Sequence, residues 1–155
     1  MINITLDVNN ERYQVEVAAY HTLRDVLRDK LGFTDVKNGC SEGECGSCAV
    51  LVDGKPVTSC LMLAAQAQGK KITTPRGIAT DGKLHPLQEK FIEYGASQCG
   101  YCTPGMLISA KALLDRNPNP TEEEVRVAIS GNICRCTGYQ QIVEAIMATA
   151  AGMNK

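Results

Sequence analysis

The chain has 155 residues, of which 44% are hydrophobic, so it can bury a real core as one domain or as two small ones. Its 16 lysines and arginines nearly balance 17 aspartates and glutamates, and no basic run forms a phosphate-binding stripe, which argues against nucleic acid as a partner. The first residues lack the basic and apolar regions of a signal peptide, and no segment approaches the ~20 apolar residues of a membrane span. We therefore expect a cytoplasmic protein that does not enter a membrane.

The chain begins with a predicted β-hairpin. Apolar residues alternate with polar ones over residues 2–8 and again over residues 13–17, which is the pattern of strands with one buried face. Asn9 and Asn10 lie between the two stretches and favour a tight turn. The protein is therefore predicted to start with a sheet.

A helix is predicted directly after the hairpin. Thr22 precedes apolar residues that recur at helical spacing over residues 23–31. Asp25 stands where a capping partner of Thr22 would, and Gly32 suits the C-terminal stop. We expect this helix to pack across the sheet.

A loop rich in cysteine and glycine, NGCSEGECGSC, follows the helix. Next, AVLVDGKPVTSC predicts two short strands around a turn at Asp53 and Gly54, and residues 71–74 could supply a last strand. Residues 75–83, PRGIATDGK, are rich in turn formers, and the sequence beyond them has a helical pattern. We therefore divide the chain into a first domain at 1–76, a linker at 77–83 and a helical domain at 84–155.

Four helices are predicted in the second half. They cover residues 86–94, 103–116, 121–130 and 138–150. Two of their start signals are clear, because Thr103 is an N-cap followed by Pro104, and Thr121 opens a capping box with Glu124. The fold class is thus predicted to be α+β, with a sheet domain followed by a small helical bundle.

Four of the eight cysteines lie in the first half, with the spacing C-x4-C-x2-C-x11-C. They are Cys40, Cys45, Cys48 and Cys60. This is the plant-type ferredoxin spacing for a 2Fe–2S cluster, and Gly39, Gly43 and Gly46 would relax the loop so that its amides can approach the sulfurs. The alternative is a zinc-stabilised loop, which uses the same ligand type in a closed tetrahedral site. Three cysteines in a single loop, with the fourth ligand remote from them in the sequence, favour a cluster of iron and sulfide over a zinc site.

The other four cysteines form two pairs in the helical half. They are Cys99, Cys102, Cys134 and Cys136. Two pairs supply four ligands, enough for a second all-cysteine cluster, and each pair precedes a predicted helix whose N-terminus would favour an anionic centre. A thiol–disulfide role for CGYC would require a βαβ context that the helical pattern does not give. Thr103 in place of histidine after the pair disfavours covalent haem, and His21 and His85, at predicted helix starts, are interpreted as surface or capping residues.

The segments VKNGCSEGECGSCAVLVDGKPVTSC, QCGYCTPGM and SGNICRCTGYQQIVEAI closely resemble the iron–sulfur subunit of the molybdenum hydroxylase family. That family includes xanthine dehydrogenase, aldehyde oxidoreductase, nicotinate dehydrogenase, carbon monoxide dehydrogenase and 4-hydroxybenzoyl-CoA reductase. The resemblance covers nearly the whole chain. It implies a β-grasp plant-type ferredoxin domain followed by a C-terminal four-helix bundle, each holding one 2Fe–2S cluster.

The resemblance also implies how each group is used. The first four cysteines would bind the cluster nearer the flavin, and the second four would bind the cluster nearer the molybdenum cofactor. Gln98 would hydrogen-bond the pterin, and Cys136 would lie against it. Molybdopterin and FAD would then belong to a large and a medium partner subunit, in a hetero-oligomer such as a dimer of heterotrimers.

The preferred hypothesis is an electron-transfer subunit with no substrate-converting site of its own. Electrons would pass from the molybdopterin site through the two 2Fe–2S clusters to FAD on another subunit. Two alternatives stay open from the residues, a stand-alone two-cluster ferredoxin and a zinc-stabilised assembly module. The near-neutral charge weakly disfavours the free carrier, because such carriers often use strong charge to steer their encounters.

Overall fold

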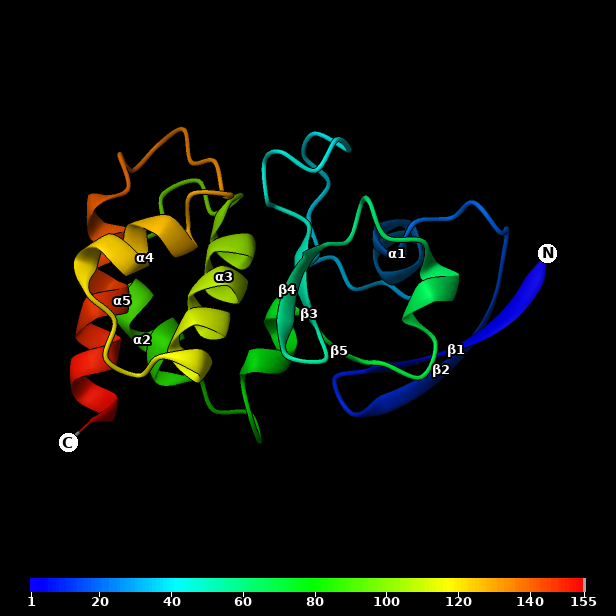
Figure 1. Ribbon diagram of the computed structural model, residues 1–155, viewed down its shortest axis with the longest axis horizontal. Helices are drawn as coiled ribbons and strands as arrows, with labels where there is room; N and C mark the ends of the chain where they lie inside the picture. The colour runs from blue at the N-terminus through cyan, green and yellow to red at the C-terminus, as the bar shows by residue number, and fades with distance from the viewer. Residues whose placement is uncertain (155) are drawn as a thin grey trace.

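A computed structural model describes residues 1–154, with a sheet half and a helical half lying along its longest axis (Figure 1). The first half contains β1 Ile2–Val8, β2 Glu11–Val17, α1 Leu23–Asp25, η1 Val26–Lys30, β3 Ala49–Val52, β4 Lys55–Thr58, η2 Ala64–Ala67, β5 Lys71–Thr73 and η3 Pro75–Ile78. The second half contains α2 Pro86–Glu93, α3 Thr103–Arg116, α4 Glu122–Ala128 and α5 Gln140–Met153. Lys155, the end of the predicted helical domain, lies outside the described residues.

The sheet has five strands in the order β2-β1-β5-β3-β4. β1 and β5 pair in parallel, and every other neighbouring pair is antiparallel. The predicted hairpin is confirmed: Asn9 and Asn10 both have positive φ, 53° and 67°, the conformation that a two-residue turn between twisted strands requires. Asp53 and Gly54 make the same kind of turn between β3 and β4.

The helix predicted after the hairpin begins as expected but continues differently. The Thr22 side chain accepts a hydrogen bond from the Asp25 amide and the Asp25 carboxylate accepts one from the Thr22 amide, so the predicted capping box is confirmed. After α1 the helix widens into the π-helical turn η1, in which the Leu31 amide donates to the Val26 carbonyl at 2.9 Å. The sequence pattern predicts one regular helix here, and that prediction is wrong in this detail.

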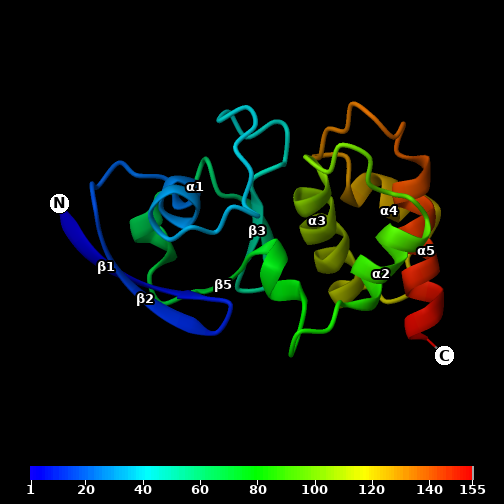
Figure 2. The same cartoon turned by 180° about the vertical axis from the view of Figure 1, so that it is seen from behind.

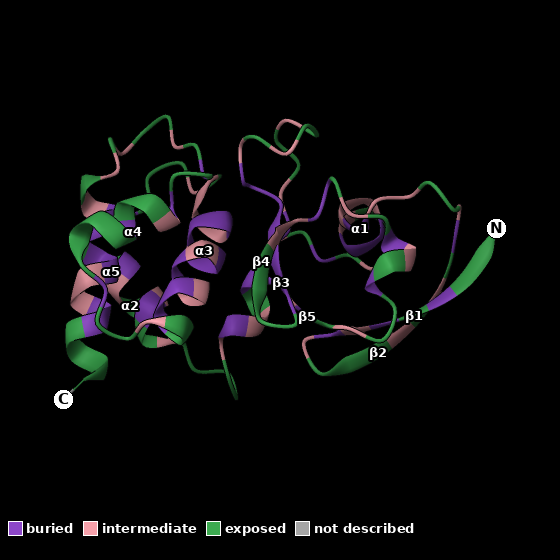
Figure 3. Ribbon diagram, viewed as in Figure 1, coloured by how far each residue is buried: buried purple, intermediate pink, exposed green. Residues whose placement is uncertain are grey.

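Strand β3 is buried on both faces and joins the two halves of the molecule (Figure 3). Val50 and Val52 belong to the core that β1, β5 and α1 form. Ala49 and Leu51 face the other way and belong to the core of the helical half, because successive side chains of a strand point to opposite faces. Helix α3 packs directly against β3, so the sheet forms part of the surface against which the helical half packs.

The helical half is built around α3 and α5. Helix α2 packs on α5 and α3, and α4 packs on both as well. Helix α3 spans the predicted residues 103–116, whereas α5 begins at Gln140, two residues later than predicted, because Gly138 and Tyr139 both adopt positive φ. Within residues 1–154, no helix has the length and apolar character needed to cross a bilayer.

His85 caps α2, and this cap makes a pH-dependent contribution to stability that can be measured. Its Nδ1 atom accepts a hydrogen bond from the Leu87 amide at 3.1 Å, which requires the neutral imidazole. Burial, assisted by the charge of Lys111, lowers the pKa of His85. The unfolded chain therefore binds this proton more readily, and the free energy of unfolding is expected to fall as the pH drops below about 6.5.

The His85→Asn variant tests this expectation, because asparagine keeps a capping acceptor but does not titrate. Urea denaturation between pH 5 and 8 should show a smaller loss of stability at acid pH in the variant than in the unaltered chain. His21 is the other histidine and is common to both proteins, so it cancels in the comparison. Parallel pH profiles for the two proteins would contradict the assignment.

Candidate functional site

The two cysteine groups lie along one long edge of the molecule, in the loops at the top of Figures 1 and 2. Cys40, Cys45 and Cys48 come from the loop between η1 and β3, and Cys60 follows β4. Cys99 and Cys102 precede α3, and Cys134 and Cys136 precede α5. All eight cysteines are free thiols.

In the first group the thiols approach one another two by two. Cys40 is within hydrogen-bonding reach of the Cys45 thiol, and Cys60 is within reach of the Cys48 thiol. Backbone amides of Cys45 and Glu42 lower the pKa of Cys40 to about 6. Burial, with the neighbouring Cys48 thiol, raises the pKa of Cys60 to about 11. Cys40 is therefore poised as a thiolate, and Cys48 and Cys60 are shielded from water.

Glycines bring the loop close to these sulfurs. A Cβ atom on Gly39 would lie 2.5 Å from the Cys45 Sγ and 2.6 Å from the Ser47 Oγ, so only glycine fits there. The Glu42 and Cys45 amides donate to the Cys40 Sγ at 3.3 and 3.4 Å, so this loop does direct amides at sulfur. Gly46 has a further role that was not predicted: a Cβ atom there would lie 2.3 Å from the Gly131 carbonyl oxygen, in the helical half of the molecule.

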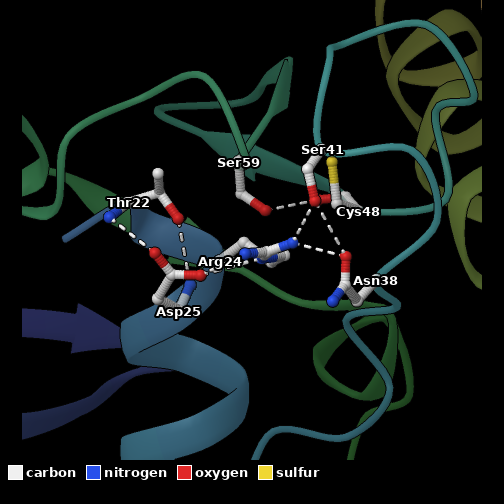
Figure 4. Close-up of polar contacts among 7 residues, drawn as sticks. All are labelled: Thr22, Arg24, Asp25, Asn38, Ser41, Cys48 and Ser59. Atoms are coloured by element: carbon white, nitrogen blue, oxygen red, sulfur yellow. Dashed lines mark hydrogen bonds and ion pairs between the residues drawn. The ribbon is translucent and has the colours of Figure 1, made fainter.

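Arg24 of α1 reaches across to the first cysteine loop (Figure 4). Its guanidinium donates to the Asn38 Oδ1 and, at 2.8 Å, to the Ser41 Oγ, which flank the stretch that carries Cys40. The same guanidinium pairs with the Asp25 carboxylate, and its side chain is only 13% exposed. The arginine thus ties the capped start of α1 to the cysteine loop.

Replacing Arg24 by methionine is expected to loosen this loop. The variant keeps the apolar stem but loses the hydrogen bonds to Asn38 and Ser41 and leaves Asp25 without its cation. We expect the free energy of unfolding to fall by about 1–3 kcal/mol in urea denaturation, the range for charged hydrogen bonds that are lost. The matched control is Arg12→Met on the exposed side of β2, which should change stability by less than about 0.5 kcal/mol. Equal effects would contradict the anchoring role.

The second group also forms pairs. Cys102 lies within hydrogen-bonding reach of Cys134, and Cys99 within reach of Cys136. Burial raises the pKa of Cys102 to about 12, and the adjacent Cys134 thiol adds to the effect. Burial also acts to raise the pKa of Cys134, but hydrogen bonds from the Thr137 hydroxyl at 3.0 Å and amide at 3.4 Å outweigh it and bring that pKa to about 7.

Tyr139 and Thr137 are residues of this group that sequence reasoning missed. The Cys134 amide donates to the Tyr139 hydroxyl oxygen at 2.9 Å, and the Tyr139 amide donates to the Thr137 Oγ1 at 3.1 Å. Tyr139 holds φ at 70°, a left-handed conformation that costs energy in a residue other than glycine. Nothing in the sequence pattern marks these two side chains as supports of a cysteine loop.

The two helix starts differ from each other. Helix α3 begins directly after Cys102, as predicted, but the prediction that Thr103 is its N-cap is wrong: Cys102 holds that position, and the Thr103 hydroxyl donates to the Ser97 Oγ at 2.9 Å. Helix α5 begins four positions after Cys136. The expectation that both helix N-termini stand at the cysteines is therefore met by α3 alone. Gln98 is exposed next to Cys99, and Cys99 and Cys136 are exposed as well.

The pairing of the thiols fits a 2Fe–2S cluster in each group. Within the residues that the structure describes, no three metal-binding side chains converge on one point. A 2Fe–2S cluster carries two protein ligands on each of its two irons, so it requires four thiolates arranged as two pairs. Both groups present that arrangement, with amide and hydroxyl donors next to the sulfurs.

Comparison with known proteins agrees with this chemistry. Residues 6–75 match the family model of a 2Fe-2S iron-sulfur cluster binding domain, and residues 74–147 match that of a [2Fe-2S] binding domain. The chain is 55% identical over 145 residues to the nicotinate dehydrogenase small FeS subunit of Eubacterium barkeri, covering 94% of this chain and 92% of that protein. It is 44% identical over 148 residues to the xanthine dehydrogenase iron-sulfur-binding subunit of Escherichia coli O157:H7, covering 94% and 92%.

Solved structures give the same result. A chain of quinoline 2-oxidoreductase from Pseudomonas putida 86 superposes with a TM-score of 0.94 at 44% identity, over 99% of this chain and 96% of that one. Aldehyde oxidoreductase from Desulfovibrio gigas superposes with a TM-score of 0.93 at 44% identity, over 99% of this chain but 17% of that one. The same fold therefore occurs as a separate chain and as part of a longer one.

Proposed function

Because the chain belongs to the family of iron–sulfur small subunits of molybdenum hydroxylases, we propose that its eight cysteines hold two 2Fe–2S clusters as four iron-binding pairs. Cys40 with Cys45 and Cys48 with Cys60 serve the first cluster. Cys102 with Cys134 and Cys99 with Cys136 serve the second. The observation that carries the proposal is the approach of the thiols in these four pairs.

The chain is the electron-transferring component of a multi-subunit oxidoreductase and carries no substrate-converting site. The clusters, when bound, accept and pass on one electron at a time. The residues of this chain stabilise the thiolate charge through the amides on Cys40 and the Thr137 hydroxyl and amide on Cys134. Because a reduced cluster is more negative, these donors favour reduction, whereas burial of Cys60 and Cys102 opposes it.

We extend the proposal to the architecture. A β-grasp ferredoxin domain ends at residue 76, a linker spans 77–83, and a four-helix bundle follows from residue 84. Two observations support this division. The two halves have separate cores, and the match to the first family model ends at residue 75, while the match to the second begins at residue 74. A cytoplasmic location is supported by the eight free thiols, which the reducing cytosol would maintain.

The partners that we propose are a large subunit with molybdopterin and a medium subunit with FAD. Relatives include the small FeS subunit of a nicotinate dehydrogenase and the small subunit of a nicotine 6-hydroxylase, which supports an assembly of this kind. The exposed positions of Gln98, Cys99 and Cys136 support a contact with the pterin at the helical end. Electrons would then enter at the second group, cross to the first and leave toward FAD.

Metal analysis and electron paramagnetic resonance (EPR) test the proposal on protein purified through a tag on this chain. About four irons and four sulfides per chain, with two distinct 2Fe–2S signals after dithionite reduction, are expected. Larger subunits that co-purify should contain molybdenum and flavin. Zinc without iron would instead indicate an assembly module, and a stable chain with both clusters and no bound subunit would indicate a free carrier.

A further inference from the structure

The loops that carry the two cysteine groups touch each other directly. The Tyr101 hydroxyl donates to the Asn38 carbonyl at 2.5 Å, and the Ile133 amide donates to the Cys45 carbonyl at 3.0 Å. A third contact runs from the Asn132 Nδ2 to the Gly46 carbonyl at 3.2 Å. These contacts join residues far apart in the sequence, so the loops themselves, and not only the packed cores beneath them, set the separation of the two groups.

The contact between Ile133 and Cys45 joins the two groups by the most direct route of the three. Ile133 is bonded to Cys134 of the second group, and Cys45 belongs to the first group. From one thiol to the other the path consists of covalent bonds and a single hydrogen bond. Electrons tunnel more readily through bonds and hydrogen bonds than across gaps. The Tyr101 contact, by comparison, runs through a whole side chain and ends at Asn38, two residues before Cys40.

Asn132 holds this contact in place. It is 4% exposed, and its Nδ2 reaches Gly46 while its Oδ1 accepts from the Ser109 hydroxyl at 2.6 Å. Its own amide donates to the Ile129 carbonyl at 2.9 Å. The side chain is thus fixed between α3 and the first cysteine loop, with its polar atoms satisfied on both sides, as a buried amide requires.

The surfaces meet too closely for any larger residue. A Cβ atom on Gly105 would lie 2.2 Å from the Gly46 carbonyl oxygen, and one on Gly46 would lie 2.5 Å from the Asn132 Nδ2. Helix α3, the loop before α5 and the first cysteine loop therefore meet backbone to backbone around Asn132. A close approach of this kind leaves little freedom for the Cys45 carbonyl to move away from the Ile133 amide.

We propose that the hydrogen bond from Ile133 to Cys45 is the electronic contact between the two clusters and that Asn132 is the positioning residue that keeps it closed. The inference rests on the proposed cysteine ligands. One electron moves, the second group's cluster is oxidised and the first group's cluster is reduced, and no bond forms or breaks. The side chain of Ile133, which is 57% exposed, takes no part.

Substitution at Ile133 separates the backbone donor from the side chain. Ile133→Pro removes the amide proton, and Ile133→Ala keeps it. In the fully reduced complex, the proline variant should show a smaller spin–spin splitting between the two EPR signals, because the through-bond part of the coupling is lost while the through-space part stays. When the oxidised complex receives one electron by flash photoreduction, redistribution of that electron between the clusters should slow. The alanine variant should match the unaltered protein in both measurements. A proline variant with full iron and sulfide content and unchanged splitting and rate would overturn the proposal.

Asn132→Asp provides a second test that does not depend on how the proline variant folds. The variant loses the donor to Gly46 and places a carboxylate against that carbonyl. Hydrogen exchange at the Ile133 amide should become about ten- to a hundredfold faster, because a buried hydrogen-bonding group is left unsatisfied. Electron redistribution should slow in parallel.

The matched control is Ser130→Ala, which removes an exposed hydroxyl from the same loop. It should leave exchange at Ile133 and electron redistribution unchanged. Unchanged exchange and rate in Asn132→Asp would overturn the role of Asn132. Absence of iron from the unaltered protein would instead refute the proposed ligands, so the two failures are distinguishable by metal analysis alone.

Discussion

Replacing Cys136 by alanine is expected to reduce the iron content from about four to about two atoms per chain and to abolish turnover with the complex's own electron acceptor. Alanine is preferred to serine because a serine oxygen could still bind iron. In the proposed assignment the variant breaks the pair of Cys99 and Cys136 and would leave one iron of the second group without half of its protein ligands. Iron and sulfide analysis, EPR and coupled activity of the purified complex provide the measurement.

The first cysteine group serves as an internal control in this variant. Its EPR signal should persist, because Cys40 and Cys45 lie in another loop and keep their hydrogen bonds. Arg135→Ala, an exposed substitution between Cys134 and Cys136, should retain both signals and full activity. Substrate should still reduce the molybdenum that the proposed large subunit would carry in the Cys136→Ala complex. Full coupled activity in that complex would contradict the electron-transfer role of the second group.

Gly46→Ala is expected to lower the free energy of unfolding by about 2–5 kcal/mol. Gly46 has a φ of 71°, which costs an L-residue about 1–2 kcal/mol. A Cβ atom there would also lie 2.3 Å from the Gly131 carbonyl oxygen, and overpacking of this kind costs about 1–3 kcal/mol more. Urea denaturation followed by circular dichroism measures the change.

Gly54→Ala isolates the conformational part of this cost. Gly54 has a φ of 78° in the turn between β3 and β4, but no atom lies within 4 Å of the position of its Cβ. Its replacement should therefore cost only about 1–2 kcal/mol. If the two alanine variants lose the same stability, the contact between Gly46 and the helical half is not as close as described.

The sequence is sufficient to predict features that depend on neighbours along the chain. The turn at Asn9 and Asn10 and the capping boxes at Thr22 and Thr121 are confirmed, because each is specified within a few residues. The spacing of the cysteines predicts their division into two groups. It does not predict which thiols pair within a group, because that depends on how the loops curve.

Features that depend on distant parts of the chain are not readable from the sequence. Asn132 contacts Gly46 across 86 positions, and no local pattern distinguishes it from an ordinary loop amide. The left-handed conformation of Tyr139 delays the start of α5, although tyrosine is rarely chosen for such a position. The widening of the first helix at η1 likewise follows from surroundings that a helical repeat does not encode.

The double burial of β3 has a consequence for how the protein matures. As the chain emerges during synthesis, Ala49 and Leu51 stay uncovered until α3 has been made, since α3 is the helix that packs on β3. The cysteine loop that precedes β3 is attached to this strand, so we expect the loop to reach its final structure no earlier than the strand does. We therefore expect the first half to complete its fold only after the second half arrives, so that both cysteine groups become ready for iron and sulfide in a single maturation step.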